Sequence, residues 1–221
     1  MRGHMDQKLK INPWWSMWVK PKATIRAIID TNSRYGFITL CFLYGLVQTI
    51  HLTQIASLGD RLPLWGIIAL SLIFSIPVGF ICFSFATLFI YFIGKILRGQ
   101  GSYYEVRAAI SWPNVTAIFT LISIGVLILT FQEIFFYRNF SEIIPQDWRV
   151  VLVVTFIFIE GILGIWKFII FIMALSEVQK FSGWMAFLNV VLAGIVFGVL
   201  FFLLSIVFSP NGGNNIGLLT R

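Results

Sequence analysis

Five long apolar runs constrain this chain more than any other feature of its sequence. They cover residues 35–58, 64–96, 113–136, 150–175 and 184–208. Each run exceeds the roughly 20 residues that a helix needs to cross the hydrocarbon core of a membrane. Lipid offers no partner for backbone polar groups, so each run should be a helix, and none shows the alternation of a β-barrel strand. The expected fold is an all-α membrane protein, a bundle of five transmembrane helices, with a kink at Pro77.

The composition leaves little besides these spans. Of the 221 residues, 58% are apolar and 11% are charged, whereas soluble domains run at about 45–50% and about 25%. A soluble enzyme, a disordered chain and a large extramembrane domain are therefore excluded. The expected organisation is a short leader at 1–5, a cytoplasmic interfacial segment at 6–34, a membrane domain at 35–208 and a flexible tail at 209–221.

Basic residues are unevenly distributed between the two sides of the expected membrane. Lys and Arg outnumber Asp and Glu by 16 to 9, and cytoplasmic loops normally carry the excess. Beyond the leader, the side of the N-terminus would hold Lys8, Lys10, Lys20, Lys22, Arg26, Arg34, Lys95, Arg98, Arg107 and Lys180. The other side would hold only Arg61, Arg138, Arg149 and Arg221. The distribution predicts a cytoplasmic N-terminus and an outside C-terminus, with lipid headgroups rather than nucleic acid beside the basic residues.

The segment before the first run has the pattern of an interfacial helix. Pro21 suits the first position of a helix, and Ile25, Ile28 and Ile29 then fall on one face. Tryptophans and basic residues, which favour the headgroup level, surround this helix. We expect an interfacial anchor formed by Trp14, Trp15, Trp18, Lys20, Lys22 and Arg26. A partner-binding helix is the alternative.

Catalytic and metal-binding signatures are absent from the sequence. It contains no phosphate-binding P-loop, dinucleotide fingerprint, zinc-protease motif or nucleophile elbow. Cys41 and Cys82 lie in apolar runs, where they are expected to be small apolar residues, and His51 has no partner placed by a motif. We therefore expect no enzyme activity, no cofactor and no metal.

Two charged residues, Glu160 and Lys167, lie inside the fourth run. Their spacing of seven residues is nearly two helical turns and places them on one face. Ionisable groups within a span are costly and usually face a polar interior or one another. The pair is therefore a candidate functional site, an ion or proton pathway. The alternative is a structural role, in which the two groups pair or Lys167 extends to the headgroups.

Small residues mark two further positions. Gly194 and Gly198 form a GxxxG pattern in the fifth run, which permits close helix packing, within the chain or between chains. The connection at 94–102 is basic and rich in glycine. Such a segment is expected to be a turn beside lipid headgroups, and a phosphate-binding loop is the alternative.

Four stretches occur in a characteristic order and spacing. They are Asn12-Pro13-Trp14 with Pro21-Lys22-Ala23, Gly99-Gln100-Gly101-Ser102-Tyr103-Tyr104-Glu105-Val106 with Ser111-Trp112-Pro113, Ile165-Trp166-Lys167 through Gln179, and Phe181-Ser182-Gly183-Trp184. Together they resemble the Yip1 domain family of five-span membrane proteins, over about residues 13–208. The compact form is similar to bacterial members, whereas eukaryotic members bind Rab GTPases and act in transport between endoplasmic reticulum and Golgi.

The resemblance implies a five-helix bundle with a cytoplasmic N-terminus, in a bacterial inner membrane. The expected function is non-enzymatic: organising the membrane or partner proteins in a trafficking-like or membrane-shaping role. Membrane lipid is the expected partner, together with a protein partner or a second copy. The alternative function is a small transporter or channel for an ion or solute, using Glu160 and Lys167.

Overall fold

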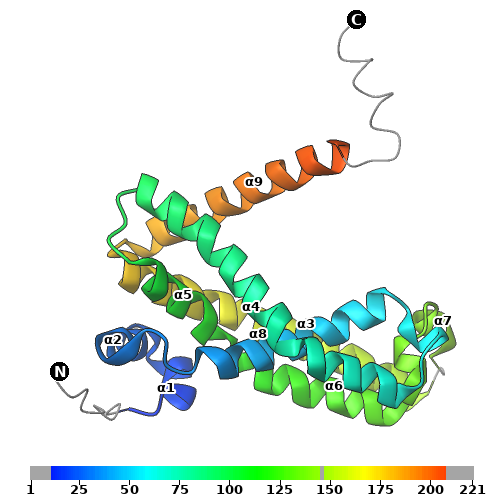
Figure 1. Cartoon of the computed structure of the whole chain (residues 1–221). Helices are drawn as coiled ribbons and strands as arrows, with labels where there is room; N and C mark the ends of the chain where they lie inside the picture. The colour runs from blue at the N-terminus through cyan, green and yellow to red at the C-terminus, as the bar shows by residue number, and fades with distance from the viewer. Residues whose placement is uncertain (1–10, 145–146, 208–221) are drawn as a thin grey trace, which may run out of the picture.

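The computed structural model describes residues 11–144 and 147–207. The leader expected at 1–5 and the tail expected at 209–221 lie outside the described residues. Within the described ranges the chain is helical and has no strand. Five helical segments are long and apolar enough to cross a membrane, which confirms the expected fold class (Figure 1).

The five spans coincide closely with the five apolar runs. The first, second, fourth and fifth are α3 (Phe37–Ile55), α4 (Leu64–Ile96), α8 (Trp148–Gln179) and α9 (Gly183–Val207). The third, Tyr103–Phe136, consists of α5 (Tyr103–Ser111), η2 (Trp112–Thr116), α6 (Ala117–Phe131) and η3 (Gln132–Phe136). Two short elements lie in the connections, η1 (Leu58–Asp60) and α7 (Phe140–Ile143).

The third span begins ten residues before the position that hydropathy predicts. The apolar run was expected to begin at residue 113, but α5 already occupies Tyr103–Ser111. Its start is fixed by a capping box, in which Ser102 accepts from the backbone N–H of Glu105 and Glu105 accepts from that of Ser102. The buried face of α5, which includes Val106 and Ala109, then packs against the rest of the protein. Tertiary burial thus stabilises a helix that is too polar to be recognised by its hydropathy.

Two short helices precede the first span. Asn12 caps α1 (Pro13–Val19), and α2 (Pro21–Asn32) begins with Pro21 at the expected first position. Ile25 and Ile28 are fully buried because α2 packs against α5 and α8. The expected amphipathic helix is therefore present, and its apolar face lies on the protein itself.

α3 and α4 form the closest helix pair in the fold. A Cβ on Gly45 would lie 1.8 Å from the carbonyl oxygen of Ser75, and one on Gly79 would lie 2.0 Å from that of Cys41. The two backbones are therefore in direct contact, as small residues allow between membrane helices. α4 continues without a break through Pro77, and a kink at this position stays a prediction.

Two apolar cores hold the bundle together. One lies at the end of the molecule that carries α1, α2 and α5, around Trp112 and Leu175. The other lies at the opposite end, between α3, α4 and α6, around Ile67 and Phe136. The end of α4 and the start of α8 thus belong to different cores, and α9 projects outward from the first (Figure 1).

Candidate functional site

Glu160 and Lys167 both face the third span, and each meets a different residue there. The hydroxyl of Thr120 on α6 donates to Glu160 Oε2 over 2.9 Å. Lys167 Nζ lies 3.5 Å from Asn114 Oδ1 in η2, a long contact for a hydrogen bond. No ion pair joins the two charges in the part of the chain that the structure describes. The sequence thus correctly indicates that they share a face, while their partners are polar side chains of another span.

Lys167 lines a pocket of about 280 Å³. Its ammonium lies 5.9 Å from the centre of the Tyr44 ring, within the range of a cation–π contact. Glu160 Oε1 is buried without a hydrogen-bond partner among the described residues. The remaining lining residues come from α4, the third span and α8: Cys82, Phe83, Ala86, Ile110, Pro113, Asn114, Gly164, Phe168 and Phe171. This is a half-open, mostly apolar pocket with one cation at its wall.

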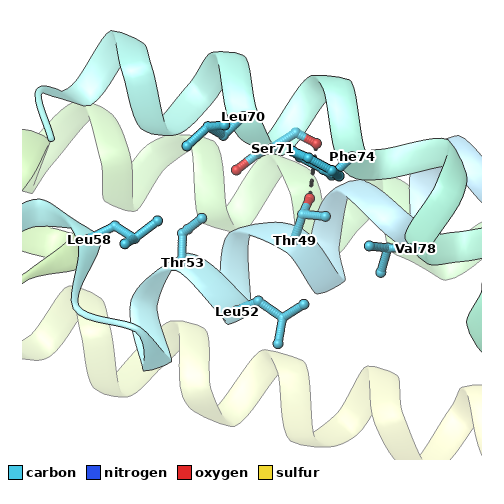
Figure 2. A pocket seen from close by; sticks show the side chains of 8 residues that line it. All are labelled: Thr49, Leu52, Thr53, Leu58, Leu70, Ser71, Phe74 and Val78. Atoms are coloured by element: carbon cyan, nitrogen blue, oxygen red, sulfur yellow. Dashed lines mark hydrogen bonds between the residues drawn. The ribbon is translucent and has the colours of Figure 1, made fainter.

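A second pocket, of about 330 Å³, lies between α3 and α4. Figure 2 shows its lining of mostly aliphatic and aromatic side chains: Thr49, Leu52, Thr53, Leu58, Leu70, Ser71, Phe74 and Val78. The Thr49 hydroxyl donates to the Ser71 carbonyl oxygen over 3.0 Å, so this polar group is already bonded within the protein. The lining suits a hydrocarbon chain better than a polar substrate.

The tryptophans expected to anchor the protein divide into two that are partly buried against it and one that is exposed. Trp14 packs edge-on against Trp112 at 5.4 Å between ring centroids, and Trp18 packs in the same way against Phe119 at 5.2 Å. Trp15, in contrast, is 70% exposed. Of the three tryptophans, Trp15 therefore offers the most surface for contact with lipid.

Charged residues of the same segment also divide by role. Arg26 on α2 forms an ion pair with Glu177 on α8, whereas Lys20 and Lys22 are exposed. The ion pair joins the N-terminal segment to the fourth span. Arg26 therefore fixes the docking of α2, and the two lysines remain available to lipid headgroups.

The glycine pattern of α9 faces open space in the part of the chain that the structure describes. A Cβ on Gly194 or on Gly198 would meet no atom within 4 Å. The same holds for Gly161 and Gly164 on α8. Packing within the chain therefore does not explain the GxxxG pattern in the described residues.

The glycine-rich connection holds a side chain of the protein itself. A Cβ on Gly94 would lie 2.2 Å from Gln179 Nε2, and one on Gly99 would lie 2.0 Å from Gln179 Oε1. The glycines therefore make room for the buried side chain at the end of α8. This contact explains the glycines without a bound phosphate, and the phosphate-binding alternative stays untested.

Sequence reasoning missed two buried amides in this region. Gln179 is 1% exposed and Asn189 on α9 is fully buried. Their amide nitrogens and oxygens have no hydrogen-bond partner among the described residues. A polar residue in an apolar run is the signal that could have identified Asn189, since buried polar groups are costly in a membrane.

The described residues bring together no group of three or more His, Cys, Asp or Glu. With its five membrane-length helices and apolar surface, the protein is an integral, multi-pass membrane protein. A comparison with known protein families matches residues 15–205 to the Yip1 domain, so the chain belongs to the Yip1 domain family. No curated protein and no solved structure matches the chain.

Proposed function

We propose that this protein organises partner proteins within its membrane and has no enzyme activity. We place it in a bacterial inner membrane with a cytoplasmic N-terminus. The ten-to-four distribution of basic residues described above supports this orientation. Membership of the Yip1 domain family supports a role in which other proteins take part.

The outer part of α9 is the observation that carries the proposal. Every residue from 194 to 205 is exposed, so this helix segment is surrounded by other molecules on nearly all sides. Phe197 makes one edge-on aromatic contact, to Phe89 of α4 at 5.4 Å between centroids. The same segment carries Gly194 and Gly198, which would allow a second helix to approach the backbone closely. We assign α9 the role of binding a transmembrane helix of another chain.

Site-specific photo-cross-linking tests this role. A photoreactive amino acid replaces Leu203 on α9, which is 53% exposed, and in a control it replaces Ile122 on α6, which is 58% exposed. We expect the α9 probe to form a discrete adduct with one protein segment, identified by mass spectrometry. The α6 probe should react with lipid. Lipid adducts alone at both positions would contradict the proposal.

Transport of an ion or small solute is the second candidate function. The pocket beside Lys167 supports it, because a cation at the wall of a mostly apolar pocket within a span is a costly arrangement. Glu160, with one unpartnered buried oxygen, lies on the same face of α8.

A flux assay in liposomes separates this candidate from the first. If the pocket conducts, Lys167→Leu changes the flux of anions or cations through the reconstituted protein. Trp65→Leu is a suitable control, because Trp65 is 75% exposed, lies at the start of α4 and does not line the pocket. No flux through the parent protein would eliminate the transport function.

A further inference from the structure

Arg107 on α5 is a buried cation without an acidic partner. The residue is 8% exposed, although arginine is almost never buried unless it is paired. Its guanidinium carbon lies 3.9 Å from the centre of the Phe37 ring and 4.9 Å from that of the Tyr104 ring. Both distances are within cation–π range. The aromatic rings thus explain how the positive charge is tolerated at this position.

The rings leave the hydrogen-bonding capacity of Arg107 unused. A guanidinium carries five N–H donors, and an aromatic ring attracts the charge without supplying an oxygen acceptor. In residues 11–144 and 147–207, Arg107 forms no ion pair, and its Nε is buried without a partner. The nearest acid along the chain, Glu105, already accepts from the Ser102 backbone N–H over 2.7 Å. The protein thus supplies no acceptor for Arg107 Nε among the described residues, and the guanidinium is available to an acceptor from another molecule.

Arg34 brings a second guanidinium to the same ring. Its guanidinium carbon lies 4.4 Å from the centre of the Tyr104 ring. The guanidinium carbon of Arg107 lies 4.9 Å from the centre of the same ring. The two positive charges are therefore close to each other. Arg34 also has no ion pair within the described residues. Two like charges at the edge of a low-dielectric region repel each other unless an anion lies between them.

The position of the two arginines identifies the kind of anion. Arg34 lies three residues before the first span, and Tyr104 is at the start of the third; at the ends of spans we expect both at the level where lipid headgroups meet water. Two guanidinium forks match the geometry of phosphate oxygens. Tyr104 is 43% exposed, which leaves the site open to the surroundings. We infer that Arg34, Tyr104 and Arg107 form a binding site for a phosphate group.

Native mass spectrometry of the detergent-purified full chain tests the site with defined probes. Phosphatidic acid is the phosphate-bearing lipid, diacylglycerol is its phosphate-free match, and glycerol 3-phosphate is its soluble match. The parent should retain phosphatidic acid and release diacylglycerol. Arg107→Gln should lower the affinity for phosphatidic acid about tenfold, since it removes a charge-assisted pair. Arg98→Gln is the matched control: it removes an exposed positive charge from the same end of the protein and should leave retention nearly unchanged.

The two phosphate probes distinguish the source of the ligand. If glycerol 3-phosphate displaces phosphatidic acid at comparable concentrations, the ligand is a soluble phosphate compound. If it does not, the ligand is a lipid headgroup. Either result supports a phosphate site. Equal retention by Arg107→Gln and Arg98→Gln would overturn it. If Arg107→Gln does not fold, two other variants test the phosphate site. Arg34→Gln changes an exposed residue, so it should not disturb folding. Arg107→Lys keeps the positive charge but loses the planar set of N–H donors that binds phosphate. Unchanged retention in both would also overturn the site.

Discussion

Buried polar side chains in this protein lie at the junctions between helices. Gln179, the last residue of α8, lies against Gly94 and Gly99, and the side chain of Asn189 on α9 also lies beside Gly94. A buried amide without a partner destabilises a fold by about 1–3 kcal/mol. These two amides are therefore retained at the expense of stability.

Replacing the Gln179 amide by an apolar group of similar shape should stabilise the fold. We expect Gln179→Met to raise the free energy of unfolding by about 1 kcal/mol, because it removes an unsatisfied buried amide. Thermal unfolding in detergent, followed by circular dichroism, measures the change. Gln100→Met is the control, since Gln100 is exposed and should shift the free energy by less than about 0.5 kcal/mol. A loss of stability in Gln179→Met would show that the amide is hydrogen-bonded in the folded protein.

The charges within α8 show what a sequence can and cannot predict at this scale. Helical spacing predicted that Glu160 and Lys167 share a face, and both do meet the third span. Their partners, Thr120 and Asn114, are set by how two spans pack, and no local pattern contains that information. The contact of Arg107 with Phe37 and Tyr104 was missed for the same reason.

At the scale of helices, the pair α3 and α4 depends on two glycines. The backbone oxygen of Ser75 occupies the place where a side chain on Gly45 would begin. Any larger residue there must separate the two helices, and overpacking of this kind costs about 1–3 kcal/mol or more. The α3–α4 contact should therefore be sensitive to any added side-chain volume at these glycines.

Alanine substitutions separate this effect from helix propensity. Gly45→Ala should lower the unfolding free energy by at least about 2 kcal/mol. Gly66→Ala, on α4, should be neutral or slightly stabilising, because its Cβ would meet only Pro63 at 3.8 Å and alanine favours a helix. Thermal melts of both variants provide the measurement. Equal melting temperatures would show that the two backbones are not in close contact.

The helices that could be predicted from the sequence are those that consist of a long apolar run. The apolar runs located all five spans because a membrane admits little else. The segment α5 was missed although its capping box, Ser102 with Glu105, is visible in the sequence. That signal fixes a helix start without saying that the helix will be buried, and the burial of Val106 and Ala109 follows from packing against other elements.

For the whole molecule, five spans place the two ends of the membrane domain on opposite sides. The distribution of basic residues predicts that the N-terminal segment is cytoplasmic. Cysteine labelling in intact spheroplasts tests this in a background that lacks Cys41 and Cys82. Trp15→Cys should react with a membrane-impermeant maleimide only after lysis, whereas Arg138→Cys should react before lysis; both side chains are exposed. The opposite pattern would invert the proposed topology.

Of the five spans, α9 ends in a long segment that is exposed on nearly all sides. The helix packs on α4 and α8 with buried residues only before residue 194, and it projects from the bundle (Figure 1). Sequence alone identified the GxxxG pattern but could not show that side chains on Gly194 and Gly198 would meet no other atom of the described residues. Because no helix of the described chain packs on these two glycines, we propose that a helix of another chain does.

Native mass spectrometry of the protein released from nanodiscs of its own membrane tests this central claim most directly. We expect the parent to carry a second protein chain, either another copy or a different protein. Gly198→Ile should lose that chain. Gly125→Ile on α6 should keep it, because a Cβ at Gly125 also meets nothing within 4 Å and the change is otherwise the same. A parent protein that is released only as a monomer with lipid would contradict the account.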